Sequence, residues 1–192
     1  LLNCGDVMQD AALFYANKAK CPDFSLPEHF ILATLHRAEN TDSPERLQSI
    51  IAALEEIARE MPVVIPIHPR TRKKLQELNF DFKQTRLQLV DPVGYLEMVH
   101  LLKHCSLVAT DSGGLQKEAY FFKKYCITLR TETEWVELVE QGANIITGWR
   151  YEDILNNYKQ LKHTTKDVFS SPLYGDGEAG HIIIRELQRI DS

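Results

Sequence analysis

Short apolar runs alternate along the chain with longer segments in which apolar residues recur every three or four positions. A short apolar run bounded by polar or turn-forming residues is typical of a strand buried on both faces. Such runs predict strands at residues 30–35, 63–67, 86–90, 106–110, 125–129 and 144–148. The segments between them predict helices, because residues three and four positions apart share one helix face.

The helical pattern is clearest after Pro44, where apolar residues recur at three- and four-residue steps as far as Ala58. Ser43 is a suitable N-cap for this helix, and proline is favoured in a first helical turn. A helix within residues 1–20 is expected to begin after Asp6, which can cap it. Further helices are expected at residues 72–78, 96–102, 115–121 and 179–190, with a short one before residue 144.

Strands that alternate with helices favour a parallel sheet, because a parallel strand is reached only through a crossover connection. We therefore expect an α/β fold, with helices on both faces of one parallel sheet. In such sheets ligands bind outside the carboxyl ends of the strands, where the strand order reverses. The residues that follow the strands are thus the candidates for a functional site.

The stretch 109–119 joins a predicted strand to a predicted helix through the tight turn Ser112-Gly113-Gly114. The first backbone N–H groups of a helix have no partner within it, so such a turn can hold a phosphate oxygen. Glycine has no Cβ, so Gly113 and Gly114 let an anion approach the backbone closely, and both residues can take positive φ at little cost. Ser112 can cap the helix or offer its hydroxyl to the same anion. Glu118 lies about one turn further on, within reach of a sugar diol attached to the phosphate. The alternative is a purely structural turn, with Asp111 and Ser112 as caps.

Polar residues also follow three other predicted strands. They are His36, Arg37, Glu39 and Asn40, then His68 and Arg70, and finally Arg130 and Glu134. Because the carboxyl ends of parallel strands lie at one edge, we expect these residues to converge with the glycine turn on a diphosphate. A guanidinium grips phosphate through its planar fork, and histidine near neutral pH can donate a proton to a departing oxygen. In the alternative interpretation, His36 bonds to the backbone and His68 fills a turn.

Composition narrows the classes of function. At 192 residues the chain is expected to form one domain. A net charge of −5 gives no general attraction to nucleic acid or to an anionic membrane, so we expect neither as a partner. The sequence has no signal-peptide or bilayer-spanning pattern, and its four cysteines lack metal-ligand spacing, which together indicate a reduced, cytoplasmic protein without a bound metal. The first residue is Leu1 rather than Met, from which we expect a longer parent protein.

Four motifs together resemble one enzyme family. They are His36-Arg37-Ala38-Glu39-Asn40, Ile67-His68-Pro69-Arg70-Thr71, the stretch 111–119 and Tyr174-Gly175-Asp176-Gly177. In this order and spacing they resemble the UDP-N-acetylglucosamine (UDP-GlcNAc) 2-epimerases. The opening Gly5-Asp6-Val7-Met8 is similar to the segment that joins the two domains of that family. The resemblance covers nearly the whole chain, but only the C-terminal half of the family's usual length.

The resemblance implies the C-terminal half of a glycosyltransferase-B type fold. Residues 1–28 would be an interdomain segment with a leading helix, and residues 29–192 a Rossmann-like, UDP-binding domain that includes the C-terminal helix. The family's reaction interconverts UDP-GlcNAc and UDP-N-acetylmannosamine (UDP-ManNAc) by eliminating UDP and adding it back, without a cofactor. The carboxylates that act at C2 belong to the other half of the family's fold. We therefore expect the isolated chain to bind UDP weakly and to be inactive, and the full-length enzyme to be an active homodimer that takes a UDP-sugar.

The resemblance also assigns roles to individual residues. His36 would be catalytic, facing the glycosidic oxygen and the diphosphate, with Arg37, Glu39 and Asn40 beside it. Phosphate oxygens would be bound by Ser112, Gly113 and Gly114, the ribose by Glu118, and the same pocket would be lined by His68, Arg70 and Arg130. Uracil is expected near Pro92 and Tyr95.

Two departures from the family pattern leave alternatives open. Lys117 replaces the usual acidic residue after Gln116, and we expect it to change surface charge rather than function. Trp135-Val136 interrupts the run that commonly follows Arg130 in the family, which leaves open the sugar and uracil contacts of this loop. The alternatives are a hydrolysing epimerase that releases ManNAc, a UDP-sugar glycosyltransferase and a non-catalytic module that binds nucleotide sugars.

Overall fold

One parallel sheet forms the centre of the computed structural model, which describes residues 2–164 and 166–190. Its strands follow the order β3-β2-β1-β4-β5-β6, and every neighbouring pair is parallel. They are β1 Ile31–Thr34, β2 Val63–Pro66, β3 Gln88–Val90, β4 Leu107–Thr110, β5 Cys126–Thr128 and β6 Asn144–Ile146. Each lies within a predicted strand, so the α/β fold with a parallel sheet is confirmed.

Helices connect the strands and cover both faces of the sheet. They are α1 Val7–Ala16, α2 Ala38–Thr41, α3 Pro44–Ile57, α4 Pro69–Glu77, α5 Tyr95–His104, α6 Gly113–Phe121, α7 Val136–Glu140, α8 Tyr151–Lys162 and α9 Ala179–Ile190. The sequence interpretation missed α2 and α8. Helix α8 is polar on average, yet its buried residues Ile154, Tyr158 and Leu161 share one face. Helix α2 is a single turn of four residues.

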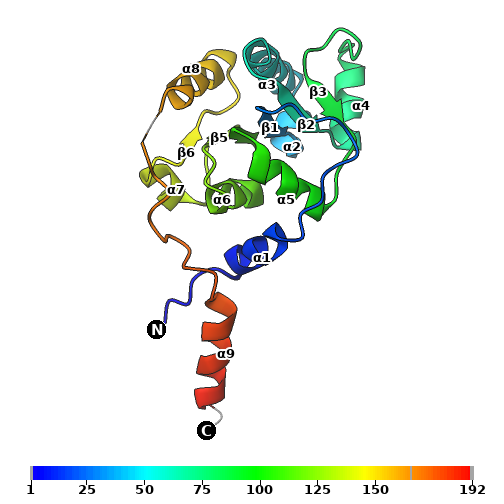
Figure 1. The fold of residues 1–192 in the computed structure, drawn as a ribbon. Helices are drawn as coiled ribbons and strands as arrows, with labels where there is room; N and C mark the ends of the chain where they lie inside the picture. Colours follow the sequence, from blue (N-terminus) through cyan, green and yellow to red (C-terminus); the bar gives the residue numbers. More distant parts are fainter. Residues whose placement is uncertain (1, 165, 191–192) are drawn as a thin grey trace.

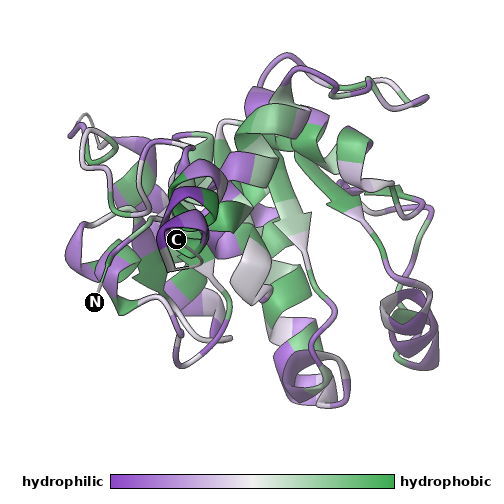
Figure 2. Cartoon of the chain, turned by 90° about the horizontal axis from the view of Figure 1, so that it is seen from below, coloured by the Kyte–Doolittle hydropathy of each residue, from purple (hydrophilic) through white to green (hydrophobic). Residues whose placement is uncertain are grey.

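Alternation along β1 shows how the sheet is buried on both sides. Ile31 and Ala33 pack in a cluster with α3, α4 and α8, whereas Leu32 packs in a second cluster with α5 and α6. Helix α1 lies against α5 and α6, outside the second layer (Figure 1). Hydropathy follows these layers. In Figure 2 the strands are mainly green, that is hydrophobic, whereas the hydrophilic purple residues lie on the outer sides of the helices.

The strand order reverses between β1 and β4. The chain runs outward from β1 to β3 and then crosses back to β4 on the other side of β1. The register aligns Thr34 with Thr110 at the ends of these strands, and their hydroxyl oxygens are 2.5 Å apart. The segments that follow β1 and β4 therefore leave the sheet side by side, at the position where a ligand is expected.

Helix ends agree with the predicted caps. The carboxylate of Asp6 accepts a hydrogen bond from the backbone N–H of Met8, and the Ser43 hydroxyl accepts one from that of Arg46.

At the other end of the chain, α9 projects from the body and exposes Ile184 and Leu187 (Figure 1). Within the described residues no helix is both long and apolar enough to cross a membrane.

Candidate functional site

A cavity of about 330 Å³ opens where the strand order reverses, beyond the carboxyl ends of β1 and β4. Its lining includes His36, His68, Pro92, Ser112, Gly114 and Glu118. These residues come from segments that follow β1, β2, β3 and β4. The expected convergence of the polar strand exits is therefore seen for part of the predicted set.

The glycine turn forms the N-terminus of α6. The Ser112 hydroxyl caps this helix by accepting a hydrogen bond from the N–H of Leu115 at 3.4 Å. Neither Gly113 nor Gly114 has a positive φ, so the conformational freedom of glycine is not what the turn uses. A Cβ on Gly113 would lie 3.3 Å from an oxygen of Glu134 and 3.6 Å from a guanidinium nitrogen of Arg37. A side chain at position 113 would therefore require Glu134 to shift by a few tenths of an ångström.

The sequence interpretation placed Asp111 at a converging strand exit but gave it no role beyond a possible helix cap. Its side chain is fully buried and does not cap α6. It accepts hydrogen bonds from the backbone N–H groups of His36, at 3.1 Å, and of Arg37, at 2.9 Å. The Nδ2 group of Asn40 donates to the same carboxylate at 3.3 Å. A charged residue directly before the glycine turn, at the end of an apolar strand, was the available signal.

The imidazole of His36 is oriented by the same carboxylate. Its Nδ1 lies 3.3 Å from an oxygen of Asp111, and its side chain is 45% exposed at the cavity. A carboxylate beside Nδ1 favours a proton on that nitrogen. The other nitrogen, Nε2, is then the one that can exchange a proton with a ligand.

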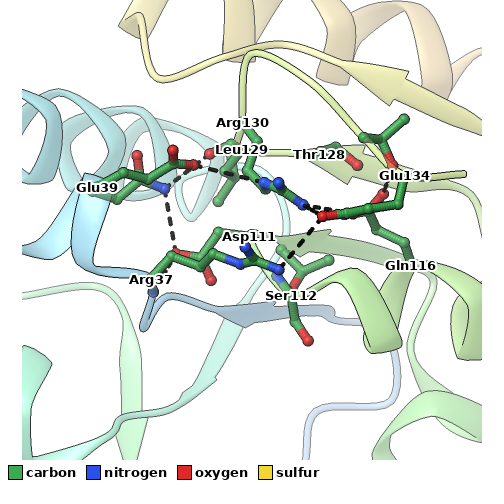
Figure 3. Close-up of polar contacts among 12 residues, drawn as sticks. Arg37, Glu39, Asp111, Ser112, Gln116, Thr128, Leu129, Arg130 and Glu134 are labelled. Carbon is green, nitrogen blue, oxygen red and sulfur yellow. Dashed lines mark hydrogen bonds and ion pairs between the residues drawn. The ribbon is translucent and has the colours of Figure 1, made fainter.

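Two arginines and two glutamates form a compact cluster beside the cavity (Figure 3). Arg130 donates from Nη1 to both oxygens of Glu134, at 2.8 and 3.0 Å, and its Nε lies 3.6 Å from Glu39. Arg37 lies 3.8 Å from Glu134. The hydrogen bonds between Arg130 and Glu134 raise the pKa of the guanidinium and lower that of the carboxyl. The two positive charges are thus balanced by two negative ones.

The remaining predicted residues of the first two strand exits take different positions. Asn40 is buried and braces the site, because its Nδ2 also donates to the backbone oxygen of Leu129 at 2.9 Å. His68 lines the cavity, and its Nδ1 accepts a hydrogen bond from the backbone N–H of Arg70. The guanidinium of Arg70 pairs with Asp42 at 2.5 Å, so the structure does not bring it to the cavity lining.

Glu118 is a largely buried carboxyl in the cavity wall. Burial raises its pKa, because a desolvated carboxylate is disfavoured, while a hydrogen bond from the Tyr95 hydroxyl opposes this shift. Burial and the same carboxylate raise the pKa of Tyr95 to about 12. The pair lies near Pro92, which also lines the cavity.

The expectation that Lys117 changes surface charge is wrong. The residue is only 5% exposed, and its ammonium forms an ion pair with Asp6. The same nitrogen lies 4.2 Å from the ring centre of Trp135 and 4.7 Å from that of Tyr174. Aromatic faces and a carboxylate together compensate a desolvated ammonium.

In the part of the chain that the structure describes, no group of three acidic, histidine or cysteine side chains is placed to hold a metal.

Comparison with known proteins agrees with this fold. The sequence matches the UDP-N-acetylglucosamine 2-epimerase family over residues 1–188. A Pseudomonas aeruginosa protein named UDP-2,3-diacetamido-2,3-dideoxy-D-glucuronate 2-epimerase is 49% identical over 99% of this chain and 53% of its own length. A Methanocaldococcus jannaschii UDP-N-acetylglucosamine 2-epimerase is 40% identical over 84% of this chain and 45% of its own length.

Solved structures give the same result. The crystal structure of the Methanocaldococcus jannaschii UDP-GlcNAc 2-epimerase in complex with UDP-GlcNAc and UDP has a TM-score of 0.83 and 36% identity, covering 96% of this chain and 54% of that one. The Neisseria meningitidis enzyme bound to UDP-GlcNAc has a TM-score of 0.81 and 28% identity, over 96% of this chain and 54% of its own. The present chain thus spans about half the length of the relatives it matches. It belongs to the UDP-N-acetylglucosamine 2-epimerase family.

Proposed function

We propose that this chain is the C-terminal, UDP-binding half of a UDP-sugar 2-epimerase. One observation carries the proposal. The imidazole of His36, held by Asp111, opens on the same cavity as the N-terminus of α6 and Glu118. That arrangement offers a proton donor, an anion site and a partner for a ribose within one pocket.

Each part of the ligand has a proposed partner. The phosphates bind to Ser112 and to the free N–H groups of Gly113 and Gly114, where the helix dipole favours an anion. The carboxylate of Glu118 accepts hydrogen bonds from the ribose hydroxyls. Uracil lies near Pro92 in the cavity wall.

The proposed reaction eliminates UDP and adds it back. Removal of the proton from C2 and cleavage of the bond between C1 and the glycosidic oxygen leave a glucal-type alkene and UDP. His36 donates a proton to the departing oxygen from Nε2, and Arg37 with Arg130 stabilises the charge that develops on the diphosphate. Return of the proton to the opposite face of C2, followed by re-addition of UDP, inverts that carbon. The groups that act at C2 belong to the other half of the enzyme.

Two substrates are candidates. The first is UDP-GlcNAc, converted to UDP-ManNAc, which is the reaction of the family that the sequence motifs resemble. The second is UDP-2,3-diacetamido-2,3-dideoxy-D-glucuronate, which is favoured by the 49% identity of the Pseudomonas aeruginosa relative over 99% of this chain. Both carry an acetamido group at C2, so the same elimination applies to either one.

We also propose that the chain needs the rest of its enzyme for turnover. The chain is about half as long as its relatives, and the apolar residues Ile183, Ile184 and Leu187 of α9 are exposed. A helix with such a face is normally covered by another part of the protein. The isolated chain is accordingly expected to bind UDP weakly without epimerase activity. We also predict that the full-length enzyme is a homodimer, which analytical ultracentrifugation can test.

Calorimetric titration with UDP tests the binding part of the proposal. Saturable binding is expected to weaken in His36→Ala and in Glu118→Ala, because each removes a proposed ligand contact. His29→Ala is the matched control, since His29 is exposed and lies outside the cavity lining. If UDP at millimolar concentration binds neither this chain nor the full-length protein, the proposed function is wrong.

Turnover of the full-length protein tests the reaction. Each candidate substrate is incubated in deuterated water and the products are followed by NMR. Inversion at C2 with incorporation of deuterium is expected for one of the two. Release of a free sugar would instead indicate the hydrolysing reaction, and an absence of product from both substrates would contradict the assigned chemistry.

A further inference from the structure

The carboxylate of Glu134 occupies the position of an anion between two arginines (Figure 3). It accepts two hydrogen bonds from Nη1 of Arg130, at 2.8 and 3.0 Å, and lies 3.8 Å from Nη2 of Arg37. Paired acceptor oxygens facing a guanidinium are also what a phosphate group presents. Glu134 is therefore bound as a ligand anion would be.

The same carboxylate lies over the start of α6. One of its oxygens is 3.3 Å from the point where a Cβ of Gly113 would be. The residues on either side of Glu134 are fastened to this helix, because the Thr133 hydroxyl donates to Gln116 at 2.6 Å and the Trp135 indole N–H donates to the carbonyl of Gly113 at 2.8 Å. The backbone of the loop is thus held over the proposed phosphate site.

Burial differs between the two partners of this ion pair. The Arg130 side chain is 5% exposed, whereas that of Glu134 is 48% exposed. A buried guanidinium needs a compensating anion, while a half-exposed carboxylate loses little when it turns into water. The glutamate is therefore the partner that a stronger anion can displace, and the arginine stays in place.

We infer that Glu134 is a tethered anion that the second phosphate of a nucleoside diphosphate must displace from Arg37 and Arg130. This inference rests on the proposed function, because it uses the same UDP site. With the site empty, Glu134 keeps Arg130 compensated. When UDP is bound, its second phosphate pairs with Arg37 and Arg130. The cost of breaking the ion pair between Arg130 and Glu134 offsets part of the binding free energy. Glu134 thus sets the affinity for diphosphates. The single phosphate of UMP binds to the N–H groups at the start of α6 and does not have to displace Glu134 from both arginines, so UMP is affected less.

The test compares UDP and UMP on this chain by calorimetry. Glu134→Gln removes the competing charge and is expected to tighten UDP binding by about threefold to tenfold, or about 0.6–1.4 kcal/mol, and to leave UMP within about twofold. Glu132→Gln is the matched control, because it removes the same charge from the same exposed loop, and Glu132 acts on Arg130 only through a coulombic interaction weaker than that of Glu134. It is expected to leave both affinities within about twofold.

Glu134→Asp separates the charge from the fold of the loop. It keeps the carboxylate, so its UDP affinity is expected to stay closer to the wild type than that of Glu134→Gln. Unchanged or weaker UDP binding by Glu134→Gln, or an equal gain for UMP, would overturn the inference while the UDP site stands. Absence of UDP binding by the wild type and by Glu134→Gln alike, in this chain and in the full-length protein, would instead overturn the proposed function, and the inference with it.

Discussion

Replacement of Asp111 by asparagine tests the buried carboxylate on which the site is built. The substitution keeps the shape of the side chain but exchanges one oxygen for an NH2 group. In the wild type one oxygen accepts from the backbone N–H of Arg37 at 2.9 Å, from that of His36 at 3.1 Å and from Nδ2 of Asn40 at 3.3 Å. The other oxygen faces the backbone N–H of His36 at 3.2 Å and its Nδ1 at 3.3 Å.

The magnitude follows from these contacts. An asparagine that keeps its oxygen towards Arg37 turns its NH2 group towards the N–H of His36, so that two donors face each other. Hydrogen bonds to a charged acceptor are each worth about 1.5–3 kcal/mol. The N–H of His36 keeps the retained oxygen as an acceptor at 3.1 Å, but every bond to that oxygen loses its charge assistance and two donors face each other at the other position. Together these changes predict a decrease of about 3 kcal/mol in the free energy of unfolding, a large part of the roughly 5–15 kcal/mol typical of a domain.

Urea unfolding followed by circular dichroism measures this loss. The matched control is Asp91→Asn, because the Asp91 side chain is 94% exposed and lies 3.5 Å from Arg72 in a surface ion pair. The control is expected to change the unfolding free energy by less than about 0.5 kcal/mol. If Asp111→Asn were equally mild, the carboxylate would not organise this site.

A second measurement reports the orientation of His36. The new NH2 group can donate to Nδ1, which moves the imidazole proton to Nε2. Nitrogen NMR of the labelled imidazole should therefore change from the Nδ1–H tautomer to the Nε2–H tautomer. A loss of stability without this change would leave the assignment of the tautomer unsupported.

Two further predictions concern α6. Lys117→Met leaves Asp6 without its buried partner and should lower the unfolding free energy by about 3 kcal/mol in urea, whereas Lys73→Met, at an exposed position, should stay within about 0.5 kcal/mol. The raised pKa of Glu118 means that the native state binds more protons than the unfolded state, so this group makes the chain more stable as pH falls through its folded pKa. Glu118→Gln removes a desolvated charge and should therefore stabilise the ligand-free chain at pH 7 while it weakens UDP binding. A destabilised Glu118→Gln at pH 7 would contradict the sign of this argument.

The sequence by itself determined the local structure. The strands, most helices, the caps at Asp6 and Ser43 and the glycine turn follow from patterns that span only a few residues. Helix α8 was also within reach, because Ile154, Tyr158 and Leu161 have helical spacing. The place of the site followed as well, since the carboxyl ends of parallel strands meet at one edge of a sheet.

Only the tertiary structure decided which charged groups meet. Asp111 bonds to the exit of β1, more than seventy positions earlier in the chain, and Lys117 pairs with Asp6 across 111 positions. The arginines after the strands do not stand as isolated positive charges, because Glu39 and Glu134 balance them. Periodicity and capping are short-range properties of the chain. Partners of buried charges depend on the strand order and on how loops close over the sheet, which only the packing of the whole domain determines.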